Sequence, residues 1–305
     1  MSKTYATLII AGGPAGYTAA LYGARSGFST AVLEKLSPGG QMATTSDVEN
    51  YPGFPGVVDG FELGERMQEG AEKAGAETVY AEVTKLDLSA NPKVAETSEG
   101  TFLGRTVILA TGAHPRKLGI PQEDGLVNRG VAYCATCDGS FYKDKVVAVN
   151  GGGNTAVGDA LYLAKLASKV YLIHRRDTLR ATPVYLQRLK DAGVEIIWNS
   201  VVAGLQADKK LTGLKLKNVK TGETSVLPVD GLFVAIGQLP ENDLVKGQVE
   251  TDRNGYIVAG EDTKTSVPGV FAVGDVRTKA VRQIITAAAD GAVAVHFAEE
   301  YLNEK

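Results

Sequence analysis

Two cysteines, Cys134 and Cys137, stand three positions apart, and the 305-residue chain has no others. An acidic residue, Asp138, directly follows the second cysteine. A pair with this spacing fits a structural disulfide, half of a metal site, two inert buried thiols, or a dithiol that is oxidised and reduced in turn. Its surroundings in the sequence decide between these chemistries.

The rest of the sequence weakens the structural and metal alternatives. A zinc site needs further ligands, and the three histidines, His114, His174 and His296, form no closely spaced pair. The apolar run near the N-terminus is too short for a secretory signal or a membrane span, so we expect a cytoplasmic protein, in which structural disulfides are rare. Inert thiols would leave Asp138 unexplained. Asp138 itself fits two roles equally well, a general acid or base at the thiols and a turn residue before Gly139.

The cysteine pair lies between two glycine-rich turns, AGGPAG at 11–16 and GGGNTA at 151–156. Each turn follows a short apolar run and precedes a helical pattern and a second apolar run, which predicts the order strand, helix, strand. Glycines at such a turn let the backbone approach a pyrophosphate, whose charge is stabilised at the helix N-terminus. We therefore expect two dinucleotide-binding units. Because Ala11 replaces the first glycine, we expect either a negative φ at Ala11 or strain taken up by Gly12.

The second strand of each unit ends in residues of opposite chemistry. In the first unit this place holds an acid, Glu34. In the second unit it begins a basic cluster: His174, Arg175, Arg176 and Arg180. A carboxylate accepts hydrogen bonds from ribose hydroxyls and repels a 2′-phosphate, whereas arginines bind that phosphate. The pattern predicts an unphosphorylated adenosine in the first unit and NADPH in the second. The alternative is that the arginines only form a solvated face at a helix start. This alternative is less attractive because cations at a helix N-terminus oppose the helix dipole.

The remaining pattern predicts how the two units are connected. The pattern of residues 77–110 predicts short alternating strands, and GVFAVGDV places Asp275 at the end of another strand. Open α/β sheets bind ligands at this end of their strands, although Asp275 could instead cap a helix. We expect an α/β fold with two Rossmann-like dinucleotide-binding domains of three layers, ββα, the second inserted into the first. The first domain would comprise 1–113 and 242–305, and the second 114–241.

The composition excludes several classes of protein. With 44% hydrophobic and 22% charged residues and a formal charge of −3, the chain is typical of globular proteins and offers no basic surface for nucleic acid. Its 36 glycines, without a collagen period, indicate tight turns or close backbone approaches to ligands.

Together these motifs resemble the low-molecular-weight, bacterial-type thioredoxin reductases that use NADPH. The segments that carry the resemblance cover nearly the whole chain in the family's order: GGPAGYTAALY, PGGQMATTSDVENYPGF, ATGAHPRKLGIP, CATCDG, GGGNTAV, HRRDTLRA and GDVRTKAVRQIITAAADG. The chain departs from the family's pattern at Ala11, at Asn150, and at Gly158, where the family often has an acid.

The resemblance implies FAD in the discontinuous domain and NADPH in the inserted one. The residues that it implies for FAD are Gly13, Pro14, Ala15, Gly16, Glu34, Lys35, Gly40, Gln41, Thr45, Asn50, Thr111, Gly112, Gly274, Asp275, Arg282, Gln283 and Ile284. Those for NADPH are Gly152, Gly153, Asn154, Thr155, His174, Arg175, Arg176 and Arg180. It also implies a cytoplasmic homodimer that reduces thioredoxin or a thioredoxin-like protein and binds neither nucleic acid nor membrane.

By the same resemblance, electrons pass from NADPH through the flavin to a Cys134–Cys137 disulfide and on to a disulfide of the partner protein. Cys137 would face the flavin, Cys134 would attack the substrate, and Asp138 would move the protons. Because the cysteines share a domain with the NADPH loop and not with the flavin, the family rotates one domain against the other. We expect the hinges near Ala113 and at 238–242.

Related functions remain as alternatives. A relative that takes electrons from ferredoxin lacks a nucleotide site, and the intact GGGNTA and HRRDTLR segments argue against it. A flavin disulfide oxidase of the same fold would consume oxygen with a dithiol, and a flavin-bearing redox sensor would give at most one reducing equivalent. A peroxiredoxin-reducing relative carries an additional N-terminal thioredoxin-like domain, which we do not expect here.

Overall fold

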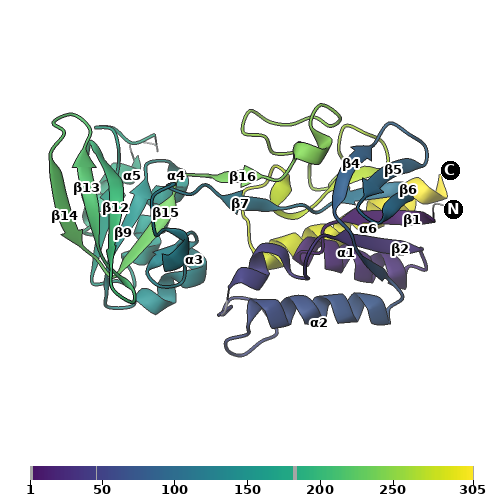
Figure 1. Cartoon of the computed structure of the whole chain (residues 1–305), viewed down its shortest axis with the longest axis horizontal. Coiled ribbons are helices and arrows are strands. Elements are labelled where there is room, and N and C mark those ends of the chain that lie inside the picture. The colour runs from purple at the N-terminus through teal and green to yellow at the C-terminus, as the bar shows by residue number, and fades with distance from the viewer. Residues whose placement is uncertain (1–2, 46, 181–183, 305) are drawn as a thin grey trace. The chain divides into compact units, whose positions relative to one another are not determined.

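Figure 1 shows the computed structural model of the chain, which describes residues 3–45, 47–180 and 184–304. The chain divides into two compact units: unit 1 comprises Met1–His114 and Leu239–Lys305, and unit 2 comprises Pro115–Gln238. Unit 2 is therefore an insertion in unit 1. The expected end of the first segment, residue 113, lies one residue from the observed end, and the expected start of the second segment, residue 242, lies three residues from the observed start.

Each unit combines strands with helices. The helices and strands of unit 1 are β1 (Thr4–Ile10), α1 (Pro14–Arg25), β2 (Thr30–Glu34), α2 (Gly60–Lys73), β3 (Glu77–Tyr80), β4 (Val83–Asp87), β5 (Lys93–Thr97), β6 (Gly100–Leu109), β17 (Val270–Ala272) and α6 (Ile284–Asn303). Those of unit 2 are β8 (Val131–Ala132), α3 (Ala135–Asp138), β9 (Val146–Gly151), α4 (Asn154–Leu163), β10 (Lys169–Ile173), α5 (Val184–Asp191), β11 (Glu195–Ile197), β12 (Ser200–Ala207), β13 (Leu211–Asn218), β14 (Thr224–Pro228) and β15 (Gly231–Ala235).

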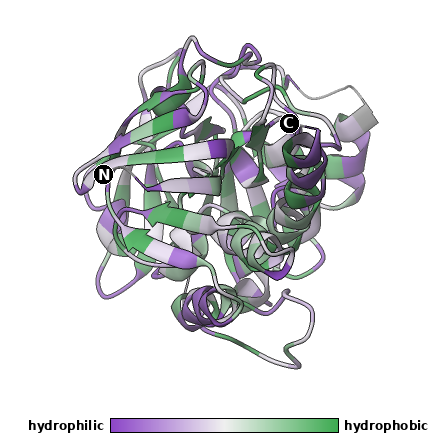
Figure 2. Ribbon diagram, turned by 90° about the vertical axis from the view of Figure 1, so that its right-hand side faces the viewer, coloured by the Kyte–Doolittle hydropathy of each residue, from purple (hydrophilic) through white to green (hydrophobic). Residues whose placement is uncertain are grey.

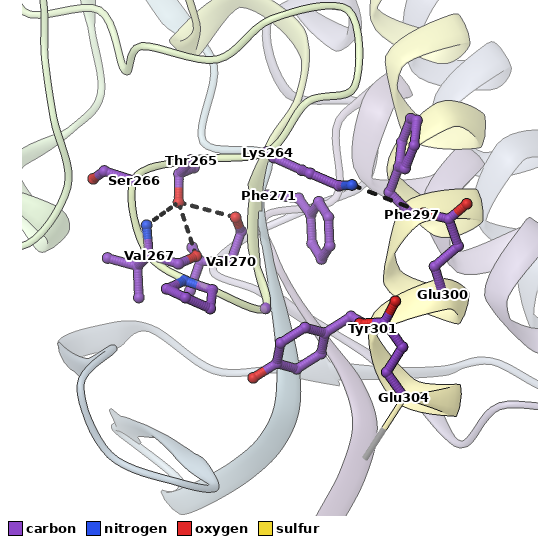
Figure 3. Close-up of a pocket in the computed structure, with 12 residues that line it drawn as sticks. Lys264, Thr265, Ser266, Val267, Val270, Phe271, Phe297, Glu300, Tyr301 and Glu304 are labelled. Atoms are coloured by element: carbon purple, nitrogen blue, oxygen red, sulfur yellow. Dashed lines mark hydrogen bonds and ion pairs between the residues drawn. The ribbon is translucent and has the colours of Figure 1, made fainter.

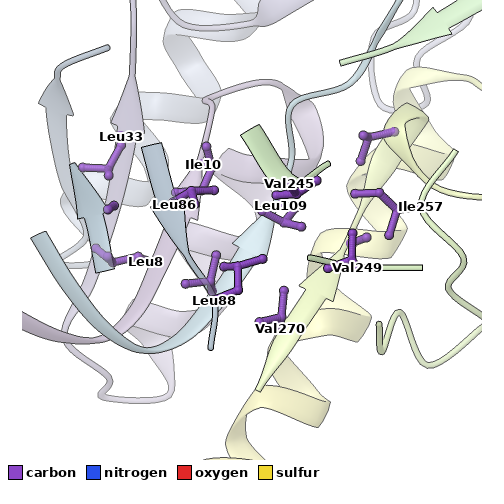
Figure 4. Close-up of a cluster of buried hydrophobic side chains, with 14 of the residues drawn as sticks. Leu8, Ile10, Leu33, Leu86, Leu88, Leu109, Val245, Val249, Ile257 and Val270 are labelled. Atoms are coloured by element: carbon purple, nitrogen blue, oxygen red, sulfur yellow. The ribbon is translucent and has the colours of Figure 1, made fainter. Parts of the chain in front are cut away.

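Unit 1 is organised around a parallel sheet in the order β3-β2-β1-β6-β17, and β5 and β4 extend β6 as an antiparallel ribbon. Alternate residues of its strands enter two different cores. Leu8 and Ile10 of β1 pack with the antiparallel ribbon and the segment that contains Ile257 (Figure 4), whereas Ile9 packs with α1 and α6 on the other face. Because both faces are covered, the strands are apolar runs without polar alternation. Figure 2, coloured by hydropathy, shows green, hydrophobic residues along strands and on helices.

Unit 2 repeats this arrangement. Its parallel sheet has the order β11-β10-β9-β15-β8, and a three-stranded antiparallel sheet, β12-β13-β14, forms the other β layer. Val147 and Val149 of β9 pack in one core with residues of α4, and Ala148 packs in the other core with residues of β12 and β13. The predicted α/β class with Rossmann-like parallel sheets is confirmed. Within the described parts of both units, no helix is long and apolar enough to cross a membrane.

The two connections between the units run together. Strand β7 (Ala113–Pro115) pairs with β16 (Gln238–Pro240) in a two-stranded ribbon (Figure 1). On the side of unit 2 the Arg116 amide donates to the Gly237 carbonyl over 3.0 Å, and on the side of unit 1 the Glu241 amide donates to the Gly112 carbonyl over 3.0 Å. Both expected hinge segments therefore belong to this ribbon.

Candidate functional site

The first glycine turn joins β1 to α1 in unit 1. A Cβ atom built on Gly13 meets no described atom within 4 Å, so the backbone is open at the helix N-terminus, and Pro14 begins the helix. Gly16 serves packing instead, because a Cβ there would lie 2.1 Å from the Ala11 carbonyl oxygen. The turn thus has the open backbone and the unsatisfied helix N–H groups that suit a pyrophosphate.

Ala11 corrects one expectation from the sequence. Its φ is +78°, so the expected negative φ at Ala11 is wrong, and Gly12 does not have a positive φ. The Ala11 amide donates to the Leu33 carbonyl over 2.9 Å, and the Ala11 carbonyl faces the backbone of Gly16. These contacts with β2 and α1 hold Ala11 in the left-handed region at some cost in backbone strain.

Glu34 supports the glycine turn from the end of β2. Its buried carboxylate accepts the Gly12 amide over 2.6 Å and the Leu36 amide over 3.0 Å. Each carboxylate oxygen has two lone pairs, so both oxygens can still accept ribose hydroxyls. The neighbouring Lys35 is turned to a different partner, because its ammonium forms a 2.6 Å ion pair with Glu82 on the surface.

Two other predicted segments reach the N-terminus of α1. A Cβ on Gly40, the first residue of a 3-10 helix at Gly40–Thr44, would lie 3.5 Å from the Gly13 Cα. A Cβ on Gly274 would lie 3.2 Å from the Ala15 Cβ. Three segments that are far apart in the sequence therefore meet at one place in unit 1.

Asp275 offers this place an unsatisfied acceptor. Among the described residues, its buried Oδ1 has no hydrogen-bond partner. Burial raises the pKa of Asp275, and the charges of Lys279 and Arg282 partly oppose that rise. An unpartnered buried carboxylate oxygen is costly unless a ligand donor reaches it. The hydroxyl groups of a flavin side chain would supply such donors, so the residues fit a flavin.

The remaining predicted residues of unit 1 lie on segments around this place. The Asn50 amide donates to the Gln283 side chain over 3.1 Å, and Gln283 caps α6, which begins at Ile284. The Thr111 hydroxyl donates to the Glu241 carbonyl over 2.5 Å. The carbonyl of Thr45 accepts the Gly60 amide, and Gly112 has a φ of +75°. The Arg282 guanidinium stacks on the Tyr256 ring at 4.1 Å, and Gln41 is exposed.

A buried ion cluster beneath Gly274 was missed by the sequence reasoning. Asp290 of α6 accepts the Arg277 guanidinium at 2.7 and 2.9 Å, the Lys279 ammonium at 2.8 Å and the Gly274 amide at 2.8 Å. Burial alone would raise the pKa of Asp290, but the hydrogen bonds from Arg277 and Lys279 lower it overall. The cluster fixes the turn that carries Asp275. A charged residue inside the apolar stretch IITAAADGAVAV is the signal that could have revealed it.

The two cysteines form a disulfide in unit 2, with Cα atoms 5.3 Å apart. Cys134 follows β8 and precedes the single turn of α3, whose first bonds are the Cys137 and Asp138 amides donating to the Cys134 carbonyl over 3.3 and 3.0 Å. Gly139 lets this turn pack closely on α4, because a Cβ there would lie 2.9 Å from the Tyr162 ring. Both cysteines are partly exposed, so inert buried thiols do not describe them.

Two carboxyl groups near this turn are perturbed by burial. Burial raises the pKa of Asp138 to about 6 and also that of Asp159, on α4, to about 6. A carboxyl group with a pKa near 6 can exchange protons close to neutral pH. This property suits Asp138 for proton transfer at the adjacent disulfide. Asp159 gave no signal in the sequence.

The second glycine turn joins β9 to α4 in the same unit as the disulfide. Gly153 is open, since a Cβ there meets no described atom within 4 Å, and Asn154 and Thr155 are exposed at the start of α4. Gly152 has a different function, because its Cα lies against the His174 ring. The open backbone of Gly153 at a helix N-terminus fits a pyrophosphate as the first turn does.

The basic cluster follows β10. Arg175, Arg176 and Arg180 are exposed, and in the described part of the chain none of them forms an ion pair. Arg175, Arg176 and Arg180 lie in a segment of bends and irregular backbone after β10, and α5 is described from Val184 onward. The Arg180 amide donates to the Gly152 carbonyl over 2.8 Å, which brings the arginine segment to the glycine turn. Three exposed guanidinium groups on the segment that reaches this turn fit a phosphorylated ribose.

A pocket of about 320 Å³ lies elsewhere in unit 1, between the start of β17 and the end of α6 (Figure 3). Lys264 on its wall lies 4.3 Å from the Phe297 ring and 3.8 Å from Glu300. None of its lining residues is a predicted site residue. It lies at the amino end of the strand, whereas ligands of α/β sheets bind at the carboxyl ends.

The comparisons with known proteins agree with this geometry. The model of the pyridine nucleotide-disulphide oxidoreductases matches residues 5–291. The chain belongs to this family. It is 47% identical to a thioredoxin reductase of Streptomyces coelicolor and 44% identical to one of Listeria monocytogenes, and each match covers 99% of the chain and 95% of the relative. The crystal structure of thioredoxin reductase from Streptococcus pyogenes is 43% identical, matches with a TM-score of 0.92 and covers 100% of both chains.

These matches confirm the resemblance to the thioredoxin reductases and the prediction of a flavoprotein oxidoreductase. Family membership implies a flavin and a pyridine nucleotide. Unit 1 offers the open Gly13 backbone, Glu34 and the Oδ1 of Asp275, which has no partner among the described residues. Unit 2 offers the open Gly153 backbone and also contains the redox disulfide.

Proposed function

We propose that this chain is an NADPH-dependent thioredoxin reductase with FAD in unit 1 and NADPH in unit 2. The observation that carries the proposal is the disulfide Cys134–Cys137 in the unit that also holds the open glycine turn and three arginines without an ion pair to any described residue. Arg175, Arg176 and Arg180 would bind the 2′-phosphate. FAD, when bound, supplies the two-electron relay between the nucleotide and the disulfide.

The chain's own residues would handle the sulfur and proton chemistry. The disulfide takes up two electrons and two protons to give two thiols. The Cys134 thiolate then attacks one sulfur of the partner's disulfide, and the Cys137 thiolate attacks Cys134 in the resulting mixed disulfide, which releases the partner as a dithiol. Asp138, with its pKa raised to about 6 by burial, would donate and accept the protons. The partner would be thioredoxin or a thioredoxin-like protein.

Anaerobic mixing of the flavin-loaded protein with NADPH tests the proposed electron donor. We expect rapid bleaching of the flavin absorbance, followed by reduction of added thioredoxin in many turnovers. Absence of bleaching would refute the proposed donor and point to a ferredoxin-dependent enzyme. Oxygen consumption with a dithiol would indicate an oxidase, and a single reduced equivalent would indicate a sensor.

We also propose a cytoplasmic homodimer. The support is the family resemblance together with the redox-active CxxC pair, because disulfides in cytosolic proteins are usually transient and catalytic. Sedimentation equilibrium of the flavin-loaded protein should give twice the chain mass of 32.0 kDa. A monomer mass at micromolar concentration would contradict the dimer.

A further inference from the structure

His174 differs from the arginines that follow it, because its side chain faces the protein. The residue is 6% exposed, whereas Arg175, Arg176 and Arg180 are exposed. It therefore cannot meet a bound nucleotide in the way the arginines can. Its contacts with the protein indicate a different role.

The imidazole connects the two segments of the nucleotide site. Its Nε2 donates to the Thr178 carbonyl over 3.0 Å, inside the arginine segment. Its ring also occupies the space beside Gly152, where a Cβ would lie 2.1 Å from Cε1. The Arg180 amide completes the connection by donating to the Gly152 carbonyl over 2.8 Å. The ring thus fills the gap between the glycine turn and the bend that carries the arginines.

Neighbouring strands hold His174 in this position. Its amide donates to the Ile197 carbonyl over 2.9 Å, its carbonyl accepts the Ser200 amide over 3.0 Å, and the Trp198 ring stands edge-on at 6.3 Å. Burial lowers the pKa of His174; the carbonyls of Thr178 and Gly151 oppose that effect, and the charges of Arg180 and Arg175 reinforce it. Because the Thr178 carbonyl can only accept, the hydrogen bond at Nε2 requires a proton on that nitrogen.

We propose that His174 is a positioning residue that sets the arginine segment through Thr178 and so determines the preference for NADPH over NADH. This inference rests on the proposed use of NADPH and adds the residue that controls it. The imidazole acts on the segment that would bind the 2′-phosphate, whereas the open Gly153 would bind the pyrophosphate. Loss of the imidazole should therefore weaken ligands that carry a 2′-phosphate and spare those that lack it.

Calorimetric titration of the oxidised, flavin-loaded protein with 2′,5′-ADP and with ADP tests the proposal. His174→Phe keeps a ring beside Gly152 but removes the hydrogen bond to Thr178. We expect the Kd of 2′,5′-ADP to rise by about three- to tenfold, the usual worth of one hydrogen bond, while the Kd of ADP stays within about twofold. His174→Gln is the matched control, because its amide can still donate to Thr178, and it should retain the preference.

The kinetic counterpart is a higher KM for NADPH, with kcat and the KM for NADH unchanged. If His174→Phe keeps the wild-type preference, or weakens both ligands equally, the positioning role is refuted while NADPH use stands. If wild type itself binds both ligands equally, NADPH use is refuted and the positioning role with it. Should His174→Phe fail to fold, His174→Asn replaces it, because this amide is one methylene too short for Thr178 and should lose the preference that His174→Gln keeps.

Discussion

Asp138 should destabilise the folded protein at the pH at which it works. Its pKa is raised by burial from 3.8 to about 6, so between these values the unfolded chain releases its proton first. The stability of the fold therefore falls as pH rises through this window and stays low above it. A shift of about two pH units at 1.4 kcal/mol per unit corresponds to about 3 kcal/mol. Asp138→Asn, which cannot ionise, should be more stable than wild type by about this amount at pH 8 and nearly equal to it at pH 4.

Urea unfolding of the oxidised protein, followed by fluorescence, measures this difference. The chain's one tryptophan, Trp198, lies in unit 2 together with Asp138, so its emission reports the relevant unit. Asp159→Asn is the matched control, because burial raises the pKa of Asp159 to about 6 as well. Both variants should gain stability at pH 8, but Asp138→Asn alone should lose turnover, by roughly a hundredfold.

The two variants separate burial from catalysis. An Asp138→Asn protein that is no more stable than wild type at pH 8 would refute the burial argument. Equal losses of turnover in both variants would refute the specific role of Asp138 at the disulfide. In wild type, the rate of thioredoxin reduction should change with pH near 6, and Asp138→Asn should lack that change.

Three further outcomes follow from the site. Asp290→Asn leaves the buried Arg277 and Lys279 underpaired, so it should cost unit 1 about 3–5 kcal/mol in thermal unfolding and release flavin. Glu62 forms an exposed ion pair with Arg66 over 2.5 Å, so Glu62→Gln is the control and should cost at most about 0.5 kcal/mol; equal effects would contradict the cluster's role. Gly13→Val places a side chain on the open face of the first turn, so the protein should fold normally but be purified without flavin, and full flavin content would argue against this site. A covalent crosslink between units 1 and 2 should abolish turnover with thioredoxin, and unimpaired turnover would refute the proposed domain rotation.

Local patterns in the sequence were sufficient for most of the fold. Both glycine turns lie between an apolar strand and a helix, and this order depends on residues close together in the chain. The basic cluster after β10 and the position of the cysteine pair before β9 followed from the same local order. The division into two units was expected within three residues because the linkers follow directly from the ends of predicted strands.

Contacts between distant segments account for what the sequence could not show. Ala11 adopts a positive φ because β2 and α1 bind its amide and face its carbonyl. Asp290 pairs with Arg277 across 13 residues, through a turn whose course depends on the packing of α6. Lys35 follows the predicted acid Glu34 but pairs with Glu82 on a neighbouring segment. None of these partners stands at a spacing that a sequence motif would reveal.

Oxidation of NADPH in the presence of thioredoxin, compared between wild type and the Cys134→Ser and Cys137→Ser variants, tests the central claim most directly. We predict many turnovers for wild type and none above background for either variant, although each variant should still bind flavin. Sustained reduction of thioredoxin by either serine variant, or its absence in wild type with full flavin, would contradict the proposed path of electrons through this disulfide.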